Sequence, residues 1–175
     1  MATFGQRAAR HLGFRGLMRL LRFYPPFLGA GVRVTACADD ASRVTVEMPL
    51  TPFNRNFVGT QFGGSLYAMC DPFLMLMLMQ RLGSDWIVWD KAARIDFLRP
   101  GRGRVRVTFE LPDERVAAIR DDTTRAGKAL PEFELLVTDE NGEPIARVHK
   151  TLHVRPKAAA RPAQGRPEPT VVAHR

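Results

Sequence analysis

Alternating apolar and polar residues predict the strands of this chain. Val44, Val46 and Met48 alternate with polar neighbours in residues 43–48, which is typical of a strand with one buried face. A glycine-rich turn at 99–103 and an Asn-Gly turn at 141–142 separate later strands, as hairpins do. The expected strands cover residues 32–37, 43–48, 87–97, 104–111, 133–138 and 145–154.

The stretch between the second and third expected strands predicts a helix over about 64–82. Asp71 is its only charged residue before Arg81, so the helix is apolar on every side and something must surround it. We therefore predict an α+β domain in which one long central helix is wrapped by a curved antiparallel sheet of five to six strands. Pro72 removes a backbone donor and is expected to kink the helix at the acid.

The N-terminal segment predicts an extra, basic amphipathic helix at about residues 5–24. No acidic residue precedes Asp39, so the helix resembles a transit peptide or a membrane-surface helix. Packing against its own domain is the favoured interpretation, because Tyr24-Pro25-Pro26-Phe27 leads on into a strand without a small-residue cleavage signal. Its basic residues are Arg7, Arg10, Arg15, Arg19 and Arg22.

Length and composition indicate one domain. The chain has 175 residues, of which 45% are hydrophobic, enough for one good core. We place a single domain at residues 1–154 and a disordered, basic, Pro- and Ala-rich tail at 155–175. Cys37 and Cys70 make no disulfide framework, which fits the cytoplasm, and no apolar run is long enough for a transmembrane segment.

The formal net charge of +8 raises the possibility of nucleic-acid binding. The surplus is spread over the N-terminus, one hairpin and the tail, and no aromatic stacking residues lie among the arginines. Nucleic acid is therefore the least favoured partner.

The polar loop before the central helix carries the strongest chemical signal. Gly63-Gly64 at the start of a helix leaves backbone N–H groups free, and no side chains keep a ligand oxygen away. Such donors commonly hold an oxyanion or a carbonyl. Asp71 follows in an apolar environment, where a carboxylate needs a functional or structural reason.

Five residues of this region match a known signature. Asn56, Gly59, Gly63, Gly64 and Asp71 follow the pattern Asn-x-x-Gly-x-x-His-Gly-Gly, six residues, then Asp or Glu. The chain thus resembles the hot-dog-fold acyl-CoA thioesterases of the phenylacetyl-CoA thioesterase type, over about residues 16–154. The stretches 89–93 and 97–101 look like a less characterised branch of this superfamily, a domain of unknown function.

The resemblance implies a hot-dog fold, hydrolysis of acyl-CoA to free acid and CoA, and no cofactor or metal. It also implies homodimers whose sheets join edge to edge, often paired again as tetramers. Helix geometry independently favours two chains at one site: Gly63 and Asp71 are eight residues apart, so about 12 Å separates them along a continuous helix. The two could not touch one carbonyl, and the partner chain would supply Asp71.

The expected roles follow from this arrangement. The thioester carbonyl would lie on the N–H of Gly63, and of Gly64 as well, while Asp71 activates water or attacks directly. Asn56 would orient the water or the carboxylate. The substrate-binding candidates are Phe62, Ser65, Met75, Lys91, Arg94, Arg99 and Arg102, together with Arg104 for the CoA phosphates and Met69, Leu74 and Leu78 for the acyl tail.

Two departures from the signature keep an alternative open. Phe62 stands where the signature has His, and Met75 stands one turn after the acid, where related catalytic branches carry Ser or Thr. The alternative is a non-catalytic acyl-CoA- or lipid-binding hot-dog protein, with Asp71 as an interface acid held by backbone donors or by Lys91. His149 and His153 share one strand face, but no third ligand suggests a metal.

Overall fold

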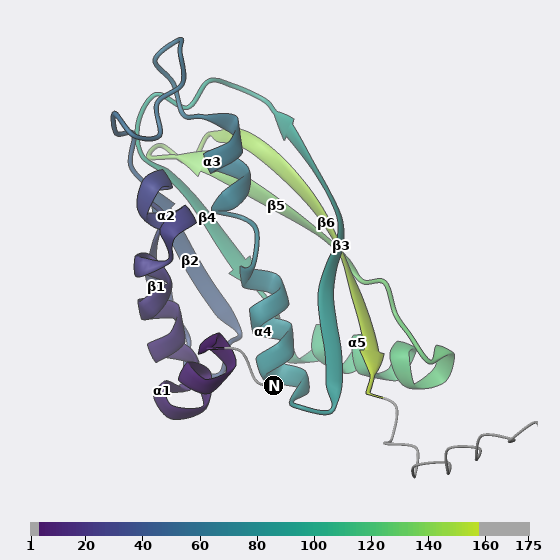
Figure 1. Ribbon diagram of the computed structural model, residues 1–175. Coiled ribbons are helices and arrows are strands. Elements are labelled where there is room, and N and C mark those ends of the chain that lie inside the picture. Colours follow the sequence, from purple (N-terminus) through teal and green to yellow (C-terminus); the bar gives the residue numbers. More distant parts are fainter. Residues whose placement is uncertain (1–3, 158–175) are drawn as a thin grey trace, which may run out of the picture.

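The computed structural model describes residues 4–157, and there one curved antiparallel sheet forms the body of the domain (Figure 1). Its strand order is β1-β2-β4-β5-β6-β3. This confirms the predicted antiparallel sheet and its six strands. They are β1 (Arg33–Cys37), β2 (Arg43–Met48), β3 (Trp86–Phe97), β4 (Val105–Glu110), β5 (Glu132–Asp139) and β6 (Pro144–Pro156).

The central helix lies against the inner face of the sheet as two segments, α3 (Gly63–Ala68) and α4 (Phe73–Leu82). The break has the cause expected from Pro72. A continuous helix would place a donor from residue 72 on the Ala68 carbonyl, which instead accepts from the Asp71 N–H at 3.2 Å. The hydrogen bonds there connect residues three apart instead of four, and a new helix, α4, begins at Phe73. Asp71 therefore lies in the joint between two helices.

The core confirms the predicted strand alternation. Val44, Val46 and Met48 of β2 are fully buried. They pack in the same core as Phe73, the first residue of α4. The Phe73 ring stacks on Phe27 with centroids 5.7 Å apart and contacts Phe109 of β4 at 5.1 Å. This aromatic contact fixes α4 between the N-terminal layer and the sheet.

The N-terminal layer packs on its own domain, as the favoured interpretation predicted. The helix expected at residues 5–24 is two segments, α1 (Phe4–Leu20) and η1 (Leu21–Phe23). The next stretch was wrongly expected to lead directly into a strand and instead forms a short helix, α2 (Pro25–Ala30). Phe14 and Met18 are buried in the core, and Arg15 donates to the Cys37 carbonyl at 3.1 Å. Figure 1 shows this layer beside α4 and β1.

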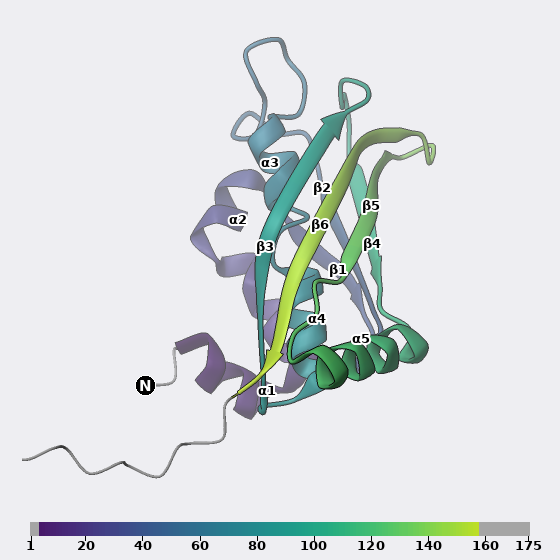
Figure 2. The same ribbon diagram turned by 90° about the vertical axis from the view of Figure 1, so that its right-hand side faces the viewer.

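A further helix, α5 (Asp113–Ala126), connects β4 to β5. Figure 2 shows it across the lower end of the sheet. Val116, Ile119 and Thr123 form its buried face. The helix ends at Gly127, whose φ of 73° gives the left-handed cap that glycine favours.

Strand β3 is a long edge of the sheet. It pairs with β6 only, and a bulge between Asp90 and Ala92 interrupts its register. Strand β6 runs to Pro156, so residues 155 and 156 belong to a strand and not to the predicted tail, while residues 158–175 lie outside the described part. Among the described residues, no helix is long and apolar enough to cross a membrane.

Glu47 ties β2 to β4 on the outer face of the sheet. Its carboxylate accepts from Arg106 at 2.6 Å and from Arg104 at 3.2 Å. Burial opposes ionisation, but these hydrogen bonds prevail and lower the pKa of Glu47 from its usual 4.5. Because the folded pKa is the lower one, this stabilisation is present above about pH 4.5 and is lost as the pH falls through the folded value.

Replacing Glu47 by Gln is therefore expected to lower the free energy of unfolding by about 1–2 kcal/mol at pH 7 and by much less near pH 3. Both arginines are more than half exposed, which keeps the effect modest. Urea unfolding at both pH values checks it. Glu110→Gln, which removes an exposed pair with Arg43, is the matched control and should change little; an equal loss at both pH values for Glu47→Gln would contradict the ionic explanation.

Candidate active site

The loop of residues 49–62 is held to the N-terminal layer by Asn54. This side chain is buried, and its Nδ2 donates to the carbonyls of Ala30 and Pro49, each at 2.7 Å. Its Oδ1 accepts from the Thr51 N–H at 2.7 Å. Asn54 thus anchors the start of the loop, a role that the sequence analysis did not assign.

Asn56 shapes the second half of the same loop. Its Nδ2 donates to the Thr60 hydroxyl at 2.8 Å, and its Oδ1 accepts from the N–H groups of Thr60 and Val58. Gly59, with a φ of 84°, makes the turn between them. In this chain Asn56 bonds to its own loop and has no hydrogen bond with Asp71, so its predicted role in orienting water stays a prediction.

Gly63 and Gly64 begin α3 directly after this loop. Within residues 4–157 no hydrogen bond uses their N–H groups, whereas the next two N–H groups donate to the Phe62 carbonyl. Both donors therefore remain available for a ligand oxygen. This is the arrangement that the glycine pair predicted.

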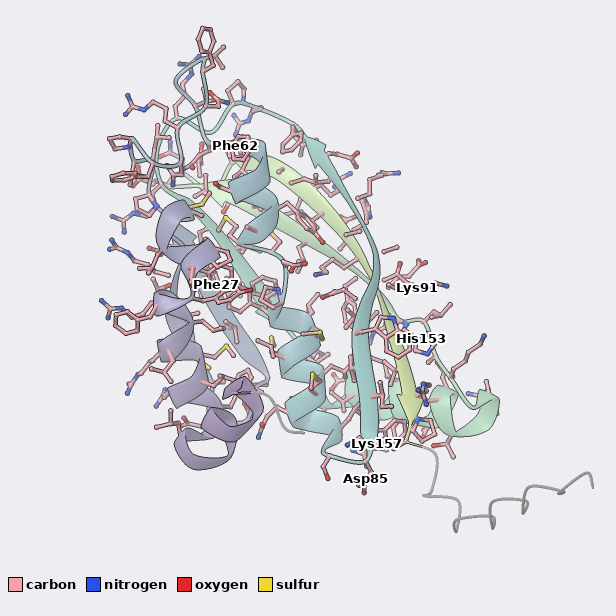
Figure 3. All side chains as sticks on the ribbon, viewed as in Figure 1. Phe27, Phe62, Asp85, Lys91, His153 and Lys157 are labelled. Carbon is pink, nitrogen blue, oxygen red and sulfur yellow. The ribbon has the colours of Figure 1, made fainter. Side chains whose placement is uncertain are left out.

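Two aromatic rings cover the glycine pair. A Cβ at Gly63 would lie 2.8 Å from the Phe97 ring, and a Cβ at Gly64 would collide with the ring of Phe62. A larger residue at either position would require the ring above it to move. Phe62 and Phe97 are themselves 55% and 58% exposed, so they present an apolar surface beside two free donors. Figure 3 shows Phe62 at the start of α3, at the opposite end of the molecule from Asp85.

Asp71 lies on the joint between α3 and α4 and is half-exposed, not buried as its apolar surroundings in sequence suggested. Its Oδ1 accepts from the Tyr67 hydroxyl at 3.0 Å and from Lys150 Nζ at 3.2 Å. Lys150 Nζ also contacts the Asp71 carbonyl at 2.5 Å and Asp90 Oδ1 at 2.7 Å. The acid is thus ion-paired and retains exposed surface.

Three groups around Asp71 have raised pKa values, and burial is the main cause for each. Burial raises the pKa of Asp90, and the attraction of Lys150 only partly offsets it. Burial, followed by the hydrogen bond to Asp71, raises the pKa of Tyr67, so its hydroxyl stays a donor. Burial also raises the pKa of Cys70 to about 12, which leaves its thiol inert as a nucleophile.

Lys150, Asp90 and Tyr67 were not predicted as site residues, although Lys150 carries a readable signal. Lys150 stands at an inward position of β6, between Val148 and Leu152, both fully buried. A lysine in the apolar half of an alternating strand requires a buried anion nearby. Lys91, the partner considered for Asp71, is exposed and lies on the outer side of β3 near His153 (Figure 3).

Three of the basic candidates for CoA phosphates gather around one turn, whereas Lys91 and Arg94 lie on β3. Arg99, Arg102 and Arg104 line a cleft of about 420 Å³ with the β5–β6 turn, and the Gly101 carbonyl accepts from the Gln61 N–H at 2.8 Å. The turn therefore lies beside the loop that leads to the glycines. Among the described residues, Arg102 and Lys91 form no ion pair, whereas Arg94 pairs with Asp96, Arg99 with Glu143, and Arg104 with Glu47.

The apolar candidates divide between core and surface. Met69, Leu74 and Leu78 are fully buried in the core of the single chain, where an acyl tail would have to displace packing. Met75 is only partly buried, and Ser65 is buried in the first turn of α3. Of these residues, Met75 remains the accessible candidate for contact with an acyl group.

The two strand histidines have partners other than a metal. His153 stacks on Trp89 with ring centroids 3.8 Å apart, and His149 lies between Asp96 and Glu134. In the part of the chain described here, no group of three His, Cys, Asp or Glu side chains is placed to hold a metal ion.

Comparison with solved structures identifies the fold. A Pseudomonas aeruginosa protein described as a probable thioesterase superimposes with a TM-score of 0.72 at 25% identity, over 84% of this chain and 99% of that one. A thioesterase from Haemophilus influenzae superimposes with a TM-score of 0.60 at 16% identity, over 81% of this chain and 90% of that one. A Chlorobaculum tepidum protein of unknown function superimposes with a TM-score of 0.66 at 18% identity, over 83% of this chain and 98% of that one. The chain has the hot-dog fold of thioesterase-like proteins.

Residues 15–154 match the family described as domain of unknown function DUF4442, and the chain belongs to that family. Both the superfamily resemblance and the less characterised branch expected from the sequence are thereby confirmed. No curated protein matches the sequence.

Proposed function

We propose that this protein hydrolyses acyl-CoA thioesters to free acid and CoA. One observation carries the proposal. Among the described residues, the N–H groups of Gly63 and Gly64 at the start of α3 have no hydrogen-bond partner, and the half-exposed carboxylate of Asp71 lies in the joint that follows the same helix. Such donors stabilise the oxyanion of acyl transfer, and such a carboxylate acts as a base. The likeness to thioesterases supports the same reaction class.

In the proposed reaction, Asp71 takes a proton from water as the water oxygen attacks the thioester carbonyl carbon. The carbonyl electron pair moves to oxygen, which the N–H groups of Gly63 and Gly64 hold. When the carbonyl re-forms, the C–S bond breaks and the CoA sulfur leaves with the proton that Asp71 had taken. No cofactor enters the scheme. Arg102 and Lys91, which have no ion pair among the described residues, would attract the CoA phosphates.

The proposed site is shared by two chains of a homodimer, which could pair again as a tetramer. Strand β3 offers twelve residues of open edge, with pairing on one side only. A second copy of β3 would extend the sheet and bring one chain's Asp71 towards the glycine pair of the other.

The free cysteines Cys37 and Cys70 support the cytoplasm as the proposed compartment.

A thiol-release assay with a panel of acyl-CoAs tests the reaction. Purified protein is expected to release free CoA thiol with at least one medium- or long-chain or aryl substrate, above the rate of a sample inactivated by heat. Background rates across the whole panel would refute hydrolysis.

Mixing two inactive variants tests the shared site. Asp71→Asn and Gly63→Ala chains, each impaired alone, are expected to recover about a quarter of wild-type activity after subunit exchange, because half of the dimers are mixed and each mixed dimer has one intact site. Two Asp71→Asn preparations mixed in the same way are the control. Absence of recovery, with exchange confirmed by mass spectrometry, would place both residues of the site in one chain.

The second candidate is a protein that binds acyl-CoA without turnover. Phe62 in place of His, together with the aromatic cover formed with Phe97, favours it by making the site apolar. Saturable acyl-CoA binding by calorimetry without thiol release would establish this function instead.

A further inference from the structure

Lys150 is a buried ammonium in the middle of strand β6. Its side chain has no exposed surface, and it is flanked on the inner face by Val148 and Leu152. An isolated charge there would be strongly unfavourable, and apolar residues occupy the other inward positions. The lysine therefore needs an explanation beyond packing.

The Lys150 ammonium joins three parts of the fold. Nζ lies 2.7 Å from Asp90 Oδ1 on β3 and contacts Asp71 at two atoms, the carbonyl at 2.5 Å and Oδ1 at 3.2 Å. The titratable groups that face this cluster are Tyr67 of α3, Cys70 and Asp71 of the joint, and Asp90. Two carboxylates thus share one ammonium.

The contacts fix the Asp71 side chain as well as its backbone. At the joint, the N–H groups of Cys70 and Asp71 donate to carbonyls three residues back, those of Tyr67 and Ala68, so the Asp71 N–H is held but its carbonyl is not part of a regular helix. The Lys150 contact to the carbonyl sets the position of the main chain, and the contacts of Lys150 and Tyr67 to Oδ1 set the side-chain rotamer. Among the described residues, Oδ2 has no partner and is left for a reacting water.

We propose that Lys150 is a positioning residue for thioester hydrolysis: it holds the Asp71 carboxylate in its reactive orientation, while Asp90 only compensates the buried charge of Lys150. This inference rests on the proposed function. Lys150 touches no substrate in this scheme and acts only through Asp71. Misplacing a catalytic group by about 1 Å can lower a rate about 100-fold, which sets the expected effect.

The test compares Asp90→Asn with the double variant Asp90→Asn, Lys150→Met. The single variant keeps the ammonium on Asp71 and is expected to retain kcat within about threefold, while the double variant should lose about 100-fold in kcat with KM within about threefold. The double variant removes the lysine and one carboxylate together, so it leaves two neutral side chains and should melt near the single variant. If it does not fold, Lys150→Gln replaces the methionine in the same background.

Arg147→Met is the matched control, because it removes a cation from the outer face of the same strand and should leave kcat unchanged. Crystal structures of both variants give a second readout that needs no activity: the Asp71 rotamer should persist in Asp90→Asn and be lost in the double variant.

A double variant that folds and turns over like Asp90→Asn overturns the proposal, as does an unchanged Asp71 rotamer. If the wild-type protein itself releases no thiol, the proposed function fails separately. The crystal structures then decide alone: a lost rotamer supports the hold of Lys150 on Asp71, and a retained rotamer overturns it.

Discussion

Replacing Asp71 by Asn is expected to lower kcat for acyl-CoA hydrolysis by about 1,000-fold or more, because the amide can neither take a proton from water nor attack the carbonyl. The side chain keeps its size. It also keeps an oxygen that can accept the hydrogen bonds of Tyr67 and Lys150. Since Asp71 is half-exposed, the melting temperature should change by only a few degrees. Thiol release under saturating substrate, together with a thermal melt, measures both quantities.

Asp85→Asn is the matched control for this change. Asp85 is an exposed aspartate beyond the C-terminal end of α4, at the opposite end of the molecule from Phe62 (Figure 3), so its replacement should leave the rate unchanged. A fully active Asp71→Asn protein would remove the carboxylate from the mechanism and leave it a structural role at the joint.

The second large effect is expected at the glycine pair. Gly63→Ala should lower kcat about 100-fold, the effect of losing one oxyanion donor, because the methyl group lies where a ligand oxygen must approach. The new Cβ also meets the Phe97 ring at 2.8 Å. That ring is exposed and can turn away, so the stability should fall only slightly. Gly29→Ala in α2, where a Cβ meets nothing within 4 Å, is the control.

A double variant separates crowding from lost chemistry. If the methyl group acts only by pushing Phe97 aside, then adding Phe97→Ala should restore the rate. We expect the Gly63→Ala, Phe97→Ala protein to stay impaired, because the donor remains obstructed. Full recovery in the double variant would mean that Gly63 serves the packing of Phe97 and that the N–H groups do not bind the carbonyl.

Much of the fold could be predicted from local pattern. Alternation such as Val44, Val46 and Met48 reflects a sheet with one buried face, and it predicted β2 with its observed bounds. Helix α5 is hard to read from the sequence because its surface is strongly charged and only a narrow buried face, including Val116 and Ile119, repeats along it. The break between α3 and α4 was predicted from the sequence as a kink at Pro72, because proline has no backbone N–H to donate.

The site was only partly predictable, for a different reason. Gly63, Gly64 and Asp71 follow one another along the chain, so their spacing could be read directly. Lys150 lies 79 positions after Asp71, and the two meet only because β6 runs inside the curved sheet beside the joint. Such a contact depends on strand order and register, which no local pattern determines. The apolar alternation of β6 still marked Lys150 as a residue in need of a buried anion.

The open edge of β3 also bears on aggregation. An edge strand of twelve residues with one open side can nucleate uncontrolled pairing with any extended segment, including strands of unfolded chains. Lys91 at the bulge and Arg94 further along are charged, exposed residues on this strand, and charges and bulges on an edge oppose such growth. The bulge and these two charges therefore protect the edge of β3 against fibrous assembly.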